Sequence, residues 1–73
     1  MEIRQRLAAN MKRLREAQGV SQEELAHRSG LHRTYISGVE RKLRNPTITV
    51  VEKIAAGLGV DVGELLGRSA KAS

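Results

Sequence analysis

The sequence predicts an all-α fold, a compact domain of five short helices, and three observations carry this prediction. Hydrophobic residues make up 40% of the 73 positions, but they are almost all aliphatic, and Tyr35 is the only Phe, Tyr or Trp. They recur at intervals of three and four, the spacing of an amphipathic helix. Cysteine is absent, which excludes both a disulfide framework and a thiolate metal site. A chain this short must therefore bury its aliphatic residues in one helical unit.

The first helix is expected from Ile3 to Gln18. Four apolar residues form one stripe along it, since they are separated by four, four and three positions. The stripe consists of Ile3, Leu7, Met11 and Leu14. At about 100° per residue, Arg15 lies about 85° from the centre of that stripe, on its edge. Gly19 should end this helix, because glycine tolerates a left-handed cap.

Two short helices should follow, separated by a turn. Ser21 and Glu24 form a capping box, which predicts a second helix from Ser21 to about Ser29. Gly30 should end it, and a third helix should run from about His32 to Arg41. The buried positions expected around the third helix are Leu31, Ile36 and Val39. Two short helices joined around a glycine have the spacing of a helix-turn-helix motif.

The last two helices are predicted from caps and spacing. Pro46 pushes Asn45 out of helical geometry, so Thr47 can cap a fourth helix. The run 48–51 is β-branched and resembles a strand, but the apolar spacing continues as a helix to Leu58. Asp61 with a glutamate three residues on predicts a short fifth helix that ends at Leu66. We therefore expect one domain over residues 1–66 and a flexible tail over 67–73.

The net excess of positive charge is confined to the first part of the chain. Residues 1–44 hold ten Lys/Arg against five Asp/Glu, whereas residues 45–73 hold three of each. Two interpretations of this excess are open: cations that keep a small domain in solution, or a surface for a polyanion such as nucleic acid. Charge alone does not choose between them.

Several classes of protein have no support in the sequence. No apolar run is long enough to cross a membrane, and no segment resembles a signal peptide, so a cytoplasmic location is expected. His27 and His32 lie on either side of a helix break without a carboxylate cluster, so neither a metal site nor a cofactor is expected. No nucleophile–base pair or phosphate loop is present, so the chain is not expected to be an enzyme.

Residues 22–41 resemble the helix-turn-helix signature of the phage-repressor-like (Cro/cI-type, XRE) family of DNA-binding proteins. The small residue at the helix crossing, the turn glycine and the β-branched residue of the third helix are Ala26, Gly30 and Ile36. The apolar partners of the motif are Leu25, Leu31 and Val39. Ser29 departs from the pattern, which has an apolar residue there, so slightly weaker packing is expected. The resemblance extends over residues 7–66 and implies a five-helix lambda-repressor-like domain.

The resemblance also implies an ion pair between Arg15 and Glu40, which would hold the third helix in place. The position of Arg15 at the edge of the buried stripe is compatible with this pair. The alternative is that Arg15 is solvated and that Glu40 is paired with Lys42 or Arg44.

The family assigns DNA contacts to the third helix, residues 32–41, which would lie in the major groove. The base-reading positions carried over from the family are Arg33, Thr34, Ser37 and Gly38. The phosphate-contacting positions are Gln22, His32, Tyr35, Arg41, Lys42, Arg44 and Asn45. Arg33 is the strongest candidate for a base edge, because its guanidinium matches O6 and N7 of guanine. The alternatives are a surface role for Gln22, a helix cap for His32 and partial core packing for Tyr35.

A regulator of this family is expected to bind an inverted repeat as a homodimer, because one helix-turn-helix offers little interface. The dimer surface is expected at Val60, Val62, Leu65 and Leu66, in the electrically neutral part of the chain. The alternative is that these residues complete the core of a single chain.

The expected function is therefore a sequence-specific transcriptional regulator of double-stranded DNA. Residues 33–41, followed by Arg44 and Asn45, particularly resemble controller proteins of restriction–modification systems. RNA polymerase is a candidate partner of such a regulator. An antitoxin that binds a toxin protein is the alternative, and the DNA-binding part of a longer ligand-sensing protein is a third possibility.

Overall fold

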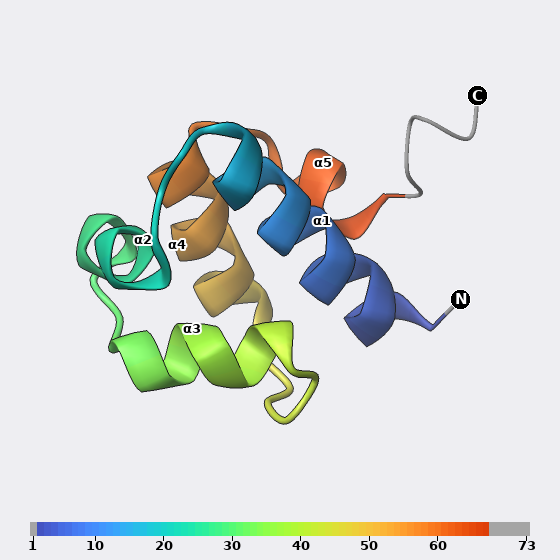
Figure 1. Ribbon diagram of the computed structural model, residues 1–73. Helices are drawn as coiled ribbons and strands as arrows, with labels where there is room; N and C mark the ends of the chain where they lie inside the picture. Colours follow the sequence, from blue (N-terminus) through green and yellow to red (C-terminus); the bar gives the residue numbers. More distant parts are fainter. Residues whose placement is uncertain (1, 68–73) are drawn as a thin grey trace.

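Five helices and no strand form the part of the chain that the computed structural model describes, residues 2–67, which confirms the all-α prediction. The helices are α1 (Ile3–Ala17), α2 (Gln22–Ser29), α3 (Arg33–Glu40), α4 (Ile48–Leu58) and α5 (Val62–Leu66) (Figure 1). The β-branched run 48–51 is helical. Of the tail expected over 67–73, only Gly67 is described, and residues 68–73 lie outside the described residues.

The helix ends follow local capping signals at two of the three expected sites. The Ser21 Oγ accepts a hydrogen bond from the Glu24 N–H at 3.0 Å, and the Thr47 Oγ1 accepts one from the Val50 N–H at 3.2 Å. Asp61 is the N-cap residue of α5, as expected, but the capping box expected with Glu64 is absent. The Asp61 side chain makes no capping hydrogen bond, and the Glu64 N–H donates to the Asp61 backbone carbonyl at 2.9 Å.

One core joins all five helices. Its members are Leu7, Met11, Val20, Leu25, Ala26, Ile36, Val39, Val51, Ile54, Ala55, Leu58 and Leu65. The buried stripe of α1 starts one turn later than expected, because the side chain of Ile3 is 48% exposed at the free end of that helix. Helix α2 packs against both α3 and α4, α1 lies against both α3 and α5, and α4 contacts α5.

Ser29 and Gly57 mark a close approach of α2 and α4. A Cβ atom on Gly57 would lie 2.5 Å from the Ser29 Oγ and 3.1 Å from the Leu25 Cδ1, so any side chain there would force these neighbours to move. The Ser29 Oγ is buried and has no hydrogen-bond partner. The departure from the family pattern at Ser29 therefore places a small but unsatisfied polar residue inside the core.

Polar side chains of α1 hold the C-terminal end of α5. Asn10 is buried, and its Nδ2 donates to the backbone carbonyls of Leu65 and Gly67, at 2.8 Å each. The Arg6 Nε donates to the Leu66 carbonyl at 3.0 Å. These carbonyls have no partner inside their own helix, so the side chains of α1 take the place of water. Sequence reasoning did not anticipate this contact, which spans 55 residues or more.

Candidate nucleic-acid interface

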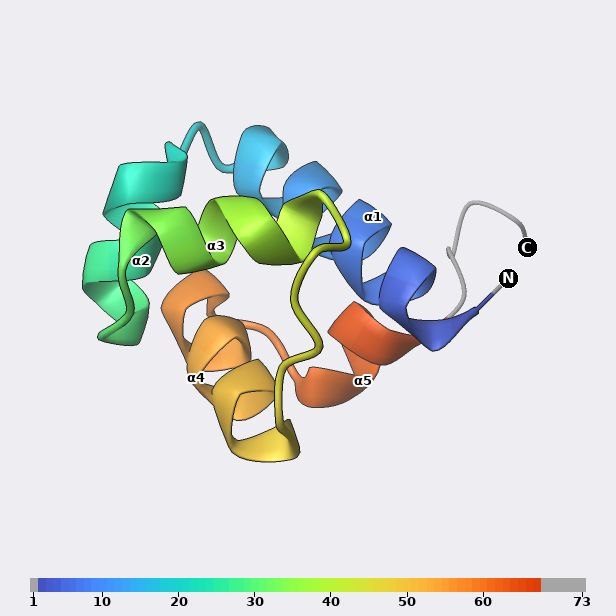
Figure 2. The same cartoon turned by 90° about the horizontal axis from the view of Figure 1, so that it is seen from below.

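The first turn of α3 presents polar side chains to solvent. Helix α3 lies on the outside of the molecule, and the connection after it runs back to α4 (Figure 2). Arg33 and Thr34 are exposed on this helix, whereas Ser37 is half-buried. His32 occupies the N-cap position, but its side chain makes no capping hydrogen bond. Among the expected base-reading residues, Arg33 and Thr34 are thus the most accessible.

Gly38 does not face solvent, and its expected place among the base-reading positions needs correction. The residue is buried, because the side chain of Arg44 lies across it. The Arg44 guanidinium carbon lies 5.6 Å from the centre of the Tyr35 ring. Tyr35 itself is half-buried and packs against the core. A ligand at this part of α3 would meet Arg44, which comes from the following connection, rather than Gly38.

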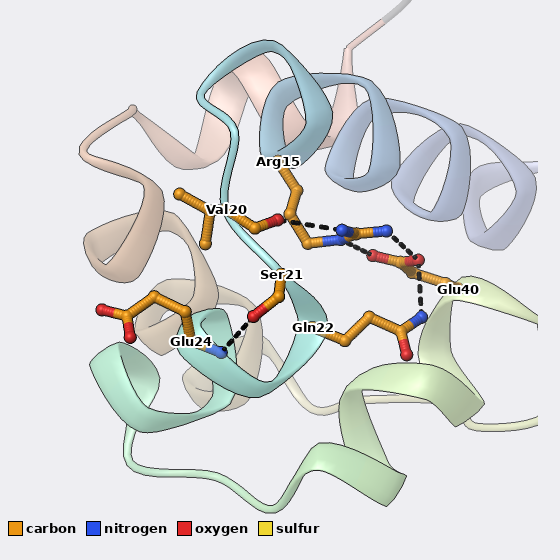
Figure 3. A network of polar contacts seen from close by, with 6 residues as sticks. All are labelled: Arg15, Val20, Ser21, Gln22, Glu24 and Glu40. Carbon is orange, nitrogen blue, oxygen red and sulfur yellow. Dashed lines mark hydrogen bonds and ion pairs between the residues drawn. The ribbon is translucent and has the colours of Figure 1, made fainter.

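A buried ion pair anchors the end of α3 (Figure 3). The Arg15 Nε and Nη2 donate to the two carboxylate oxygens of Glu40, at 2.7 and 3.1 Å. The side chains of Arg15 and Glu40 are only 12% and 5% exposed. Hydrogen bonding to Glu40 raises the pKa of Arg15, so this guanidinium stays charged. Two parallel hydrogen bonds also fix the orientation of both groups.

Two further hydrogen bonds extend this pair to α2. The Arg15 Nη1 donates to the Val20 carbonyl at 2.9 Å, and the Gln22 Nε2 donates to the Glu40 Oε1 at 3.0 Å. The network therefore joins the end of α1, the start of α2 and the end of α3. Gln22 braces α3 directly, since its amide group contacts Glu40.

A surface depression lies beside this network, where the starts of α2 and α3 face each other. Its lining consists of Arg15, Ser21, Gln22, Glu23 and Arg33. The first N–H groups of a helix have no partner within the helix and attract anions. The Arg33 guanidinium adds positive charge here, whereas the charge of Arg15 is paired with Glu40 and Glu23 adds a carboxylate. The helix N–H groups together with Arg33 make the depression a candidate site for one phosphate.

The connection after α3 carries exposed cations on a well-defined backbone. Lys42 has a left-handed conformation, with φ of 63°, and its N–H donates to the Val39 carbonyl at 3.0 Å. The Leu43 N–H donates to the Gly38 carbonyl at 2.8 Å, which completes a Schellman motif. The exposed side chains of the connection include those of Arg41, Lys42, Arg44 and Asn45.

The residues expected at a dimer surface divide into two groups. Leu65 is 0% exposed and belongs to the core of the single chain, so its expected place at the surface was wrong. Val60, Val62 and Leu66 are half-buried and pack against the core. Hydrophobic side chains that sequence reasoning missed are more exposed. These are Ile3, Leu43 and Ile48, at 48%, 65% and 67%.

Other kinds of site find no support in the described residues. Within residues 2–67, no group of three or more His, Cys, Asp or Glu side chains could hold a metal ion. No helix in this range is long and apolar enough to span a membrane.

Helices α2 and α3, packed around Gly30 with the polar face of α3 outward, form the helix-turn-helix unit of a DNA-binding protein. Residues 11–65 match the family model HTH_3, helix-turn-helix. Control protein C.SmaI of Serratia marcescens is 47% identical over 68 residues, which cover 93% of this chain and 81% of that protein. The chain belongs to the HTH_3 (XRE-type) family of DNA-binding transcriptional regulators, which confirms the family resemblance of residues 22–41.

Solved structures agree with this assignment. The hypothetical transcription factor NHTF from Neisseria aligns with a TM-score of 0.91 at 46% identity, covering 97% of this chain and 82% of that one. The restriction–modification controller protein C.AhdI from Aeromonas hydrophila aligns with a TM-score of 0.82 at 40% identity, covering 85% and 94%. The family, the five-helix fold and the similarity to controller proteins are thus consistent with one another.

Proposed function

We propose that this protein is a restriction–modification controller that binds an inverted-repeat operator as a homodimer. The observation that carries the proposal is the network of Arg15, Glu40 and Gln22, which braces α3 while its first turn remains exposed. A rigid, exposed helix between cationic flanks is what insertion into the major groove of DNA requires. The relatives named as controller and control proteins supply the regulatory role.

Each part of the surface has a role in this proposal. Arg33 reads a guanine edge, and Thr34 and Ser37 supply hydroxyl or methyl contacts to neighbouring bases. Phosphates are bound at the depression beside Gln22 and along the connection after α3. The residues assigned to phosphates are Gln22, His32, Tyr35, Arg41, Lys42, Arg44 and Asn45. Contacts of this second kind set affinity and salt dependence rather than sequence choice.

Dimerisation is assigned to the neutral part of the molecule. Val60, Val62 and Leu66 are half-buried there, and Ile48 at the start of α4 is 67% exposed. Helices α4 and α5 contact each other, so the surface proposed for dimerisation involves both helices. Two protomers joined through them would each present an α3 to one half-site. Control of transcription would follow from where the operator lies relative to the promoter, with RNA polymerase as the partner in activation.

In-vitro selection from a random duplex library, at near-physiological salt, tests the proposal. We expect enrichment of an inverted repeat with half-sites about one helical turn apart. Lys53→Ala serves as a control variant, because it removes an exposed cation from α4, outside the assigned interface. Recovery of unselected sequences, with binding that disappears as salt rises, would refute sequence-specific regulation. Binding of one half-site by a monomer would refute the dimer.

A further inference from the structure

Arg44 occupies the space that a side chain at position 38 would fill. A Cβ atom built on Gly38 would lie 2.8 Å from the Arg44 Cγ, 3.4 Å from its Nε and 3.6 Å from its Cδ. The first distance is shorter than real Cβ contacts allow, and Cγ is close to the backbone of Arg44. Any side chain at position 38 would therefore force Arg44 to leave its place on α3.

The guanidinium of Arg44 has a second contact on the same helix. It lies over the ring of Tyr35, 5.6 Å from the ring centre. A planar guanidinium stacks favourably on an aromatic face. Gly38 and Tyr35 are three positions apart, so they are neighbours on one face of α3. The backbone of the connection is also held there, since the Leu43 N–H donates to the Gly38 carbonyl at 2.8 Å.

We infer that Gly38 is a positioning residue, whose lack of a side chain lets Arg44 pack on Tyr35 and places its guanidinium on the DNA-facing side of α3 before DNA binds. A free arginine loses rotamer freedom when it is immobilised at an interface. Arg44 has lost part of that freedom already in the unbound protein, so less is lost on binding. The DNA-binding part of this inference rests on the proposed function, whereas the arrangement in the unbound protein does not.

The unbound protein provides the first test. Tyr35 is the only Phe, Tyr or Trp in the chain. A proton whose chemical shift is moved by the ring current of a Phe, Tyr or Trp side chain must therefore lie near Tyr35. In NMR spectra of the full chain, we expect the side-chain protons of Arg44 to be shifted upfield. Gly38→Ala and Tyr35→Leu should both abolish that shift. Gly63→Ala is the matched control, because it adds the same methyl group to a helical glycine with open space around it.

Folding of the key variant can be checked separately. Alanine is favoured over glycine inside a helix, and the three atoms nearest to the added methyl group all belong to the side chain of Arg44. We therefore expect Gly38→Ala to unfold at the same temperature as the parent protein or higher. The NMR chemical shifts of Arg44 in the parent protein also test the inference directly, without any substitution. Arg44 protons at random-coil positions in its spectrum would overturn the inference.

A double-mutant cycle on DNA provides the second test. The probe is the inverted-repeat duplex recovered in the selection experiment. We expect Gly38→Ala to weaken binding about three- to tenfold, the range for one side chain that must be ordered again. In the Arg44→Ala background the same change should have no further effect. Lys53→Ala measures how much DNA affinity is lost when a positive charge is removed outside the assigned interface.

The outcomes separate this inference from the proposed function. If Gly38→Ala costs as much affinity without Arg44 as with it, Gly38 acts on DNA by itself and the inference is wrong. If the selection recovers no operator, the proposed function fails, while the NMR experiment still decides whether Gly38 and Tyr35 hold Arg44.

Discussion

Arg15 and Glu40 are 25 positions apart in the sequence, yet their side chains meet through two hydrogen bonds of 2.7 and 3.1 Å. The pair is largely withdrawn from solvent, and Gln22 donates a further hydrogen bond to the same carboxylate. The end of α1, the start of α2 and the end of α3 are therefore tied together at one point. Loss of either charged partner would leave the other charge buried without compensation.

Glu40→Ala should lower the free energy of unfolding by about 3 kcal/mol, because a buried charge that loses its partner is costly. Urea denaturation at fixed protein concentration measures this. Glu24→Ala is the control, since it breaks the exposed pair with Arg28 and should cost less than about 1 kcal/mol. Equal losses in the two variants would contradict a special role for the buried pair.

Ser29→Ala should raise the free energy of unfolding by about 1 kcal/mol, because it removes a buried hydroxyl group without a hydrogen-bond partner. Ser29→Val should instead destabilise the protein, since its larger side chain would collide with α4 near Gly57. Thermal unfolding of both variants tests this pair of expectations.

Ser21→Ala is the matched comparison for Ser29→Ala. It deletes the same hydroxyl group where that group caps α2, so it should cost about 1 kcal/mol. If both serine variants lose stability, the Ser29 hydroxyl has a partner in solution and the explanation given for it fails.

Asn10→Ala should destabilise the protein by about 2 kcal/mol, because the carbonyls of Leu65 and Gly67 lose their donor. Amide hydrogen exchange should show faster opening of α5 than of α2. Asn45→Ala, at an exposed position, is the control for stability. Unchanged exchange in α5 would mean that packing of Leu65 alone holds this helix.

Arg33→Ala should relax the preference at one base position in each half-site and cost about 1–3 kcal/mol there. Repeating the selection with this variant measures the change position by position. A uniform loss of affinity for all sequences would show that Arg33 contacts only phosphate.

Much of the fold follows from signals that act over a few residues. Ser21 and Thr47 start helices because a hydroxyl group can satisfy an N–H three positions later. Gly30 and Gly59 end helices in the left-handed conformation, both with φ of 70°. Apolar spacing indicated the buried faces, although it did not show that Ile3 lies beyond the core.

The sequence predicted the candidate interface less completely than the fold. The resemblance located α3 and its polar residues, but Gly38 was expected to face DNA, and it is covered by Arg44. Leu65 was expected at a dimer surface, and it is fully buried. In both cases the missing information was how the rest of the chain covers the residue, and no periodicity of the sequence contains that.

The amino-acid sequence was thus enough for the class of fold and the order of its helices. These properties depend on caps, spacing and composition, which are local. The tertiary structure alone showed that Asn10 holds the end of α5, that Ser29 meets Gly57, and that Arg44 lies on Gly38 and Tyr35. The first two contacts depend on how helices cross in space, which is decided by the packing of the whole core, and the third depends on how the chain turns back over α3 after its last residue.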